Sequence, residues 1–141
     1  MKPYEIPTMN DRMTFKPLSI RPEESTVRAL GLILDHEIRH LPVVDGDQLV
    51  GMISDRDIRQ NWRITGGEMK GFGDVDQQTV SDLMSRHPIS VKKETSIHDA
   101  IKRMVQHKIG ALPVVDADNK LIGIFTEIDA LRYCLLLIER Y

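Results

Sequence analysis

The sequence has little that would build a disulfide-linked or thiolate-metal protein, since its 141 residues include one cysteine, Cys134. One cysteine can form neither an intrachain disulfide nor a thiolate cluster, which favours a reducing cytoplasm as the compartment. Cys134 lies in an apolar segment without His and Asp neighbours in sequence that would make it a nucleophile. We therefore expect a buried thiol.

Long apolar runs and an excess of one charge are also missing. No run approaches the roughly 18 apolar residues of a transmembrane helix, and residues 1–10 contain two prolines and a glutamate where a signal peptide has an apolar core. The 19 basic and 21 acidic residues give a net charge of −2, so no overall positive field attracts phosphate backbones. We expect neither membrane insertion nor nucleic-acid binding.

What the sequence does contain is an internal duplication. When Met13 is laid on Met84, Leu-Pro-Val-Val-Asp at 41–45 falls on the same letters at 112–116. After one extra residue near Asn119, a second shared pattern follows, Gly-x-x-Ser/Thr-x-x-Asp. Identities and apolar positions agree along the whole unit, so we interpret the chain as two copies of one structural unit.

Each copy predicts the order β-α-β-β-α. Short extended pieces at 18–20 and 89–91 precede Ser25 and Ser96, which are expected helix N-caps, and Asp99 completes a Ser-x-x-Asp capping pattern. In the second copy, the helix that begins at Ser96 has one apolar face at helical spacing, formed by Ile97, Ala100, Ile101, Met104 and Val105. Pro42 and Pro113 end the helices.

The second half of each copy predicts a hairpin and a closing helix. The hairpin strands are expected at 43–44 with 49–53 and at 114–115 with 121–125, and the closing helices at 55–63 and from 127 onward. These patterns divide the chain into repeat 1 at 8–63, a linker at 64–79 and repeat 2 at 80–141. The glycines of the linker lack the Gly-Lys-Ser/Thr ending of a phosphate loop. We expect the two repeats to pack sheet against sheet, because neither has enough apolar surface to bury alone.

These motifs, in this order and in both copies, resemble the cystathionine-β-synthase (CBS) domain, and two in tandem resemble a Bateman module. The segments His-Leu-Pro-Val-Val-Asp and Gly-Met-Ile-Ser-Asp-Arg-Asp are also similar to the CBS portion of acetoin-utilisation-type proteins. The resemblance implies an α/β (α+β) fold and a regulatory module without catalytic activity. It implies an adenosine ligand, AMP, ADP, ATP or a related adenosyl compound, with AMP or ATP expected first.

The resemblance also implies which residues bind that ligand. A carboxylate accepts hydrogen bonds from ribose hydroxyls, and a hydroxyl three residues earlier meets ribose or phosphate. A small glycine at the start of the motif leaves room for a close backbone approach. Site one combines the closing motif of the first copy with the second copy: Met52, Ser54, Arg56, Asp57, Ile89, Ile109, Gly110 and Ala111. Site two takes the reverse combination: Ile124, Thr126, Asp129, Leu18, Ile38, Arg39 and His40.

Two alternatives stay open, and a third interpretation is rejected. Arg39 and His40 of site two either block a base or bind phosphates, so site one is the favoured adenine pocket. The Ser/Thr and Asp residues of both motifs are also ordinary helix N-caps, so the pair could be a scaffold for dimerisation or interaction that binds no ligand. His36-Glu-Ile-Arg-His40 matches the zinc-protease letters, but that motif needs two helical turns, and Pro42 follows at once.

The last helix is apolar on more than one face, from Ala130 to Ile138. A partner should cover the face that the module itself does not. The resemblance implies a homodimer held by the closing helices, and a regulated enzyme or transporter as a further partner.

Overall fold

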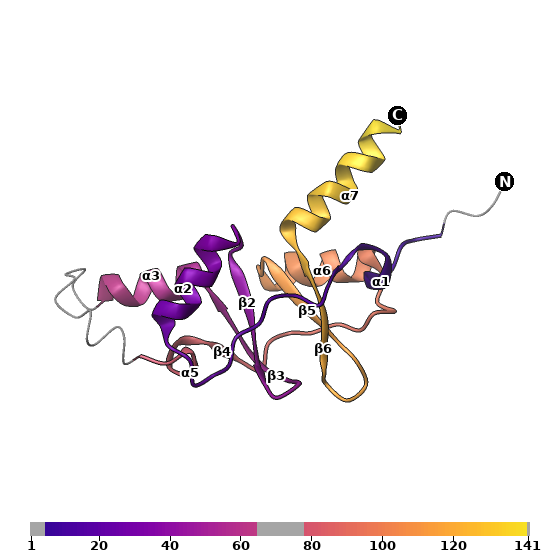
Figure 1. The fold of residues 1–141 in the computed structure, drawn as a ribbon. Coiled ribbons are helices and arrows are strands. Elements are labelled where there is room, and N and C mark those ends of the chain that lie inside the picture. The colour runs from indigo at the N-terminus through magenta and orange to yellow at the C-terminus, as the bar shows by residue number, and fades with distance from the viewer. Residues whose placement is uncertain (1–4, 65–77, 141) are drawn as a thin grey trace. The chain divides into compact units, whose positions relative to one another are not determined.

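A computed structural model describes residues 5–64 and 78–140, and it divides into two compact units (Figure 1). The first-repeat unit consists of residues 18–88, and the second-repeat unit consists of residues 1–17 with 89–141. The predicted linker, 64–79, lies outside the described residues except at its two ends. In the described part of the chain, no helix combines the length and the apolar character that crossing a membrane requires.

The first-repeat unit is a three-stranded sheet with helices. Its elements are α2 (Thr26–Asp35), β2 (His40–Asp45), β3 (Gln48–Ser54), α3 (Asp55–Ile64), α5 (Val80–Leu83) and β4 (Ser85–Arg86). The sheet order is β2-β3-β4, with both pairs antiparallel. Its core is the cluster of Ile20, Ala29, Ile33, Leu41, Val43, Ile53, Ile58 and Val80.

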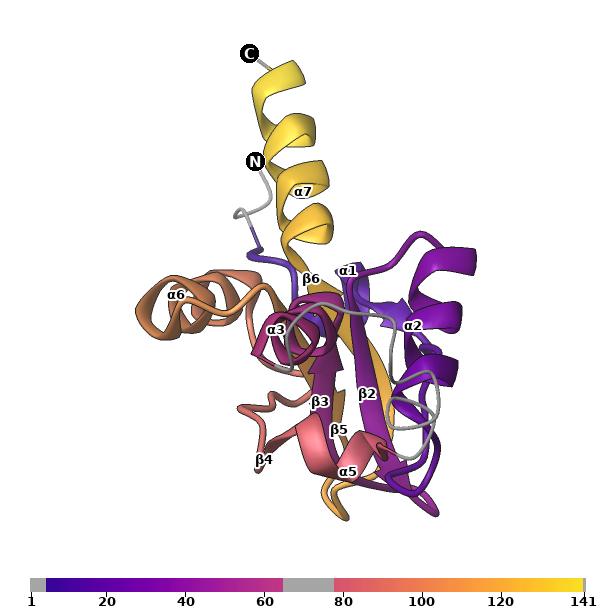
Figure 2. The ribbon, with the colours of Figure 1, turned by 90° about the vertical axis from the view of Figure 1, so that its left-hand side faces the viewer.

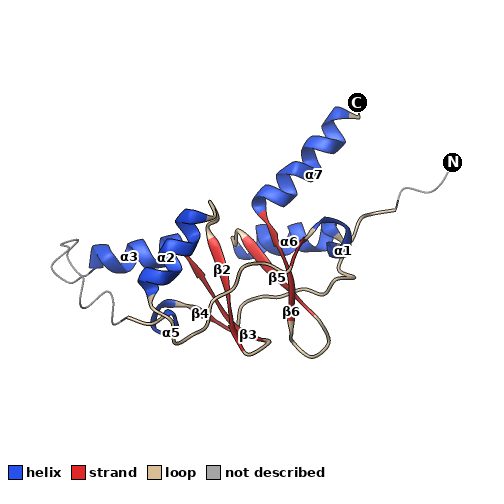
Figure 3. Cartoon of the chain, viewed as in Figure 1, coloured by secondary structure: helices blue, strands red, loops and turns tan. Residues whose placement is uncertain are grey.

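The second-repeat unit repeats that plan. Its elements are α1 (Met9–Arg12), β1 (Thr14–Phe15), α6 (Ile97–His107), β5 (Ala111–Val115), β6 (Leu121–Thr126) and α7 (Glu127–Glu139). The sheet order is β1-β6-β5, again antiparallel, and the strands are red in Figure 3. Its core is the cluster of Met9, Met13, Val91, Ile97, Ala100, Met104, Leu112, Val114, Phe125 and Tyr133.

The structure confirms the predicted α/β (α+β) fold with two β-α-β-β-α repeats, and it adds elements that the sequence did not predict. The opening strands are only single parallel bridges, Ile20 to Val43 and Val91 to Val114. Before each of them stands a lead-in, a four-residue helix and a two-residue strand. The lead-in of repeat 1, α1 and β1, belongs to the second-repeat unit. The compact units therefore differ from the sequence repeats, whose boundaries were predicted at 8–63 and 80–141.

The predicted helix caps are confirmed, with one correction. The Ser25 hydroxyl accepts from Arg28 N at 3.1 Å, and the Ser96 hydroxyl accepts from Asp99 N at 3.1 Å. The reciprocal half of the capping box at Ser96 is not formed, and Asp99 Oδ1 lies 3.3 Å from His98 Nδ1. Each serine still satisfies one of the free amides at its helix start.

The duplication extends to the backbone, because corresponding positions share the left-handed conformation. Two pairs occupy aligned positions, Lys16 (φ 48°) with His87 (φ 50°) and Glu37 (φ 53°) with Lys108 (φ 53°), and a third pair, Gly46 (φ 61°) with Asn119 (φ 63°), is offset by one residue in the alignment. The third pair lies in the hairpin turns, where glycine and asparagine are the residues that adopt positive φ at least cost. The extra residue of the second copy is therefore accommodated in its turn.

Gly51 and Gly123 are required by the close approach of the lead-in strands. A Cβ on Gly51 would lie 2.5 Å from Met84 Sδ and 2.9 Å from Ser85 O, and a Cβ on Gly123 would lie 2.5 Å from Met13 Sδ. The sequence predicted that these glycines allow a close backbone approach. In the structure, the backbone that approaches each glycine is that of a lead-in strand.

Candidate functional site

Each closing motif joins the end of a strand to the start of a helix and forms reciprocal hydrogen bonds there. Ser54 N donates to Asp57 Oδ2 at 2.9 Å, and Asp57 N donates to the Ser54 hydroxyl at 3.1 Å. Thr126 N donates to Asp129 Oδ2 at 2.9 Å, and Asp129 N donates to the Thr126 hydroxyl at 3.4 Å. The motifs are therefore capping boxes of α3 and α7, as the alternative interpretation predicted.

Capping leaves part of each carboxylate available. Both caps use the Oδ2 atom, and among the described residues Asp57 Oδ1 has no hydrogen-bond or ion-pair partner. An ionised carboxylate offers about four lone-pair positions. Asp57 can therefore cap α3 and accept from a ligand hydroxyl at the same time.

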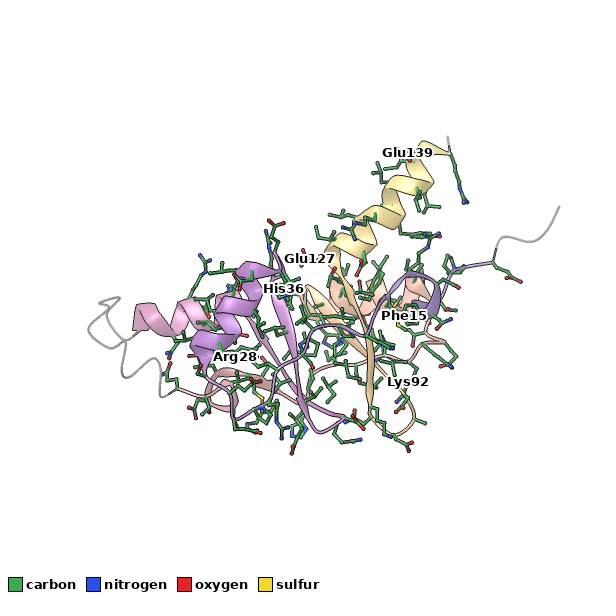
Figure 4. The ribbon with its side chains drawn as sticks, viewed as in Figure 1. Phe15, Arg28, His36, Lys92, Glu127 and Glu139 are labelled. Carbon is green, nitrogen blue, oxygen red and sulfur yellow. The ribbon has the colours of Figure 1, made fainter. Side chains whose placement is uncertain are left out.

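The segment after the first helix of each repeat lies beside the closing motif of the same repeat. His40 pairs with Ser54 across β2 and β3, and Ala111 pairs with Thr126 across β5 and β6. Asp55 N donates to Arg39 O at 3.1 Å, and Glu127 N donates to Gly110 O at 3.0 Å. Figure 4 labels Glu127 at the base of α7. Each unit thus gathers motif, post-helix backbone and helix N-terminus at one end of its sheet.

Strand register places the predicted ligand residues on one face of each sheet. Residues paired directly across antiparallel strands share a face, so Met52 with its partner Pro42 lies on the same face as His40 and Ser54. The opposite face carries Leu41 and Ile53 of the core.

The second-repeat unit has the same division. Ile124 and its partner Pro113 share a face with Ala111 and Thr126. Pro42 and Pro113, which were not among the predicted ligand residues, lie on this face as well.

The remaining predicted residues divide by exposure. Arg39 and Arg56 are exposed, and Leu18 is 38% exposed. Three isoleucines that were assigned to ligand pockets are partly buried and pack against the core of their own unit: Ile38, Ile89 and Ile109.

Site one and site two each draw residues from both units. Of the eight residues of site one, Met52, Ser54, Arg56 and Asp57 lie in the first-repeat unit and the others in the second. The combination of these halves into a site stays a prediction.

The structure also bears on two other interpretations of the sequence. His36 is the C-cap of α2, Glu37 has φ 53° and His40 begins β2, so the zinc-protease letters do not lie on one helix, as expected. In the part of the chain that is described, no three His, Cys, Asp or Glu side chains gather as a metal site would require. The prediction of a buried Cys134 is wrong, because its side chain is exposed on α7.

The exposure of Cys134 follows from the two apolar faces of α7. Ala130, Tyr133 and Leu137 pack on the core of the second-repeat unit. The other apolar residues are exposed, and the exposed fractions are 55% for Ile128, 62% for Leu131, 54% for Leu135, 41% for Leu136 and 68% for Ile138. Figure 2 shows α7 extending past α6 and α1 of its own unit.

Comparison with known proteins is consistent with this architecture. The family model of the CBS domain matches residues 6–63 and 80–136. A chloroplastic CBS domain-containing protein of Arabidopsis thaliana, CBSX2, is 34% identical in an alignment 137 positions long, and the match covers 82% of this chain and 58% of that relative. The chain thus spans less than two thirds of that protein.

Three solved structures are similar. The structure of CBSX2 in complex with AMP has 34% identity and a TM-score of 0.78, covering 93% of this chain and 98% of that one. The CBS domain pair of protein MJ0100 with 5-methylthioadenosine and S-adenosyl-L-methionine has 25% identity and a TM-score of 0.78, covering 92% and 96%. A putative acetoin utilization protein of Vibrio cholerae, AcuB, has 27% identity and a TM-score of 0.79, covering 96% and 95%.

Proposed function

The chain belongs to the CBS domain family, and on that premise we propose that it is a regulatory module that binds an adenosyl ligand through its Gly-x-x-Ser/Thr-x-x-Asp motifs. The observation that carries the proposal is the state of Asp57. Its Oδ2 atom is used by the helix cap, while its Oδ1 atom has no partner in the described part of the chain. A ribose hydroxyl can donate to that oxygen.

The ligand class follows from the relatives. CBSX2 was solved with AMP, and the pair of MJ0100 with two adenosyl compounds. We propose AMP as the first ligand to test and keep ATP as the second. The exposed Arg56, one residue before Asp57, has no ion-pair partner in the described residues and supplies a cation for a phosphate.

The predicted site residues carry over as part of the proposal. Ligand contacts from Met52, Ser54 and Asp57 are supplemented by the small residues Gly110 and Ala111. Site two, with Arg39 and His40 in the equivalent places, is the less favourable adenine site. Ligand binding regulates by linkage, since a ligand shifts a conformational equilibrium only by its difference in affinity for the two states, typically about 1–3 kcal/mol.

We further propose that the module has no catalytic activity of its own and acts as a homodimer through the exposed stripe of α7. Its members, Ile128, Leu131, Leu135 and Ile138, recur at helical spacing and are each more than half exposed. Such a stripe favours a protein partner. A regulated enzyme or transporter as a further partner, and the cytoplasm as the compartment, remain predictions.

A ligand-independent scaffold is the second candidate, because the capping boxes explain Ser54, Asp57, Thr126 and Asp129 without a ligand. A thermal-shift panel separates the two functions. We expect a saturable rise of the unfolding temperature with AMP or another adenosyl compound, amounting to about 2.7 kcal/mol of added stability at a hundred times the dissociation constant. No shift with any adenosyl compound, in a chain that still dimerises, would favour the scaffold.

A further inference from the structure

The two closing motifs contain the same residue types but differ in their hydrogen bonds. Asp129 Oδ2 accepts from both Thr126 N, at 2.9 Å, and the Thr126 hydroxyl, at 3.1 Å. Asp57 Oδ2 accepts from Ser54 N alone among the described residues. The second carboxylate therefore has less hydrogen-bonding capacity left for a ligand.

The remaining oxygen of the second carboxylate also has a partner. Asp129 Oδ1 lies 3.7 Å from Nη1 of Arg132, one helical turn further along α7. The Asp129 side chain is 10% exposed, and that of Arg132 is 74% exposed. A ligand hydroxyl that approaches Asp129 Oδ1 from solvent therefore also approaches the guanidinium group of Arg132. The corresponding residue of the first repeat is Gln60, which is uncharged and exposed.

From this difference we infer that Arg132 is a specificity-determining residue of the second motif. It competes with a ribose hydroxyl for Asp129 Oδ1, so the second motif binds adenosine compounds more weakly than the first. The inference rests on the proposed function and adds a cause of unequal sites that is independent of Arg39 and His40. Ion pairs with an exposed partner contribute about 0.2–1 kcal/mol, which corresponds to about a 1.4- to 5-fold change in affinity.

The test isolates the second motif and uses an uncharged ligand. The Asp57→Asn variant loses the charge of the first motif while its amide oxygen can still accept from Ser54 N. Calorimetric titration with adenosine compares this variant with Asp57→Asn/Arg132→Gln. In the double variant, position 132 carries glutamine, the residue type of its first-repeat counterpart Gln60. Adenosine has no phosphate, so the titration does not report attraction of Arg132 to a phosphate; a parallel AMP titration does.

We expect Arg132→Gln to lower the adenosine dissociation constant of the second motif about 1.4- to 5-fold in dilute buffer. The gain should shrink at high salt, since the ionic atmosphere screens exposed pairs. The reciprocal Gln60→Arg, in an Asp129→Asn background, should weaken the first motif by a similar factor. Thermal unfolding of every variant confirms that each remains folded.

An unchanged adenosine constant, or no adenosine binding in either variant, overturns the inference. Weaker AMP binding in Arg132→Gln with adenosine unaffected also overturns it, because Arg132 would then be a phosphate ligand. If instead the unaltered chain binds neither adenosine nor AMP, the proposed function itself fails. The two failures are therefore distinguishable.

Discussion

The tight contact at Gly51 predicts a large cost for a single methyl group. Alanine there would place its Cβ 2.5 Å from Met84 Sδ and 2.9 Å from Ser85 O. The sulfur belongs to a side chain that can shift, but the carbonyl belongs to β4, whose Arg86 and Ser85 pair with Gly51 and Met52. Relief therefore requires β4 to move away from β3.

Overpacking of this kind costs about 1–3 kcal/mol. For a chain of this size, that is roughly a 3–9 °C fall in the unfolding temperature. Gly31→Ala is the matched control, because Gly31 lies in α2 with nothing within 4 Å of its added Cβ. Alanine in that helix should stabilise the protein by about 0.5–1 kcal/mol.

Thermal unfolding followed by circular dichroism measures both changes. The two substitutions should shift the midpoint in opposite directions. If Gly51→Ala unfolds at the temperature of the unaltered chain, the packing role assigned to this glycine is refuted.

Two further predictions concern acid stability and assembly. The Asp118 and Lys120 amides donate to Asp116 at 2.8 and 2.9 Å and, led by the Lys120 bond, lower the pKa of Asp116. A lowered pKa stabilises the folded state above the ordinary carboxyl value, and this stabilisation is lost as pH falls toward the folded value. Asp116→Ala should therefore unfold earlier than the unaltered chain at pH 7, with a difference that shrinks below about pH 4; a constant difference would refute this assignment. Leu135→Glu on the exposed stripe should turn a dimer into a monomer in analytical ultracentrifugation, whereas Lys102→Glu on α6 should not, and a monomeric unaltered chain would contradict the proposed dimer.

Local signals in the sequence predicted the repeated elements well. Ser25 and Ser96 cap their helices, because an N-cap depends only on a side chain and an amide three residues later. The lead-in helices were missed although Thr8-x-x-Asp11 and Thr79-x-x-Asp82 have the capping letters, since four residues are too few for a helical period to show.

The burial of side chains on α7, and the effect of their ion pairs, could not be predicted from the sequence alone. Cys134 lies between two apolar stripes of α7, and which stripe faces the core is decided by the sheet beneath it. The i,i+3 spacing of Asp129 and Arg132 in the sequence is compatible with an ion pair on a helix. The proposed effect of this ion pair on a ligand depends on the exposed fractions of the two side chains, which only the structure gives. The structure thus supplies what separates two motifs that look equivalent in sequence.

The measurement that tests the central claim most directly is a calorimetric titration of AMP into three proteins. They are the unaltered chain, Asp57→Ala and Asp82→Ala. Asp82 is the matched control, because its Oδ2 accepts from Thr79 N at 3.0 Å as that of Asp57 accepts from Ser54 N at 2.9 Å. Each substitution should cost about 0.5–1.5 kcal/mol of stability, because it removes the capping-box hydrogen bond from the N-cap amide.

Only Asp57→Ala should also lose AMP affinity. Removing a hydrogen bond to a charged group costs about 1.5–3 kcal/mol, or about a 10- to 150-fold weaker dissociation constant. Saturable binding that Asp57→Ala weakens and Asp82→Ala leaves unchanged is the predicted result. Equal affinity in all three proteins, or no binding to the unaltered chain, would contradict the account.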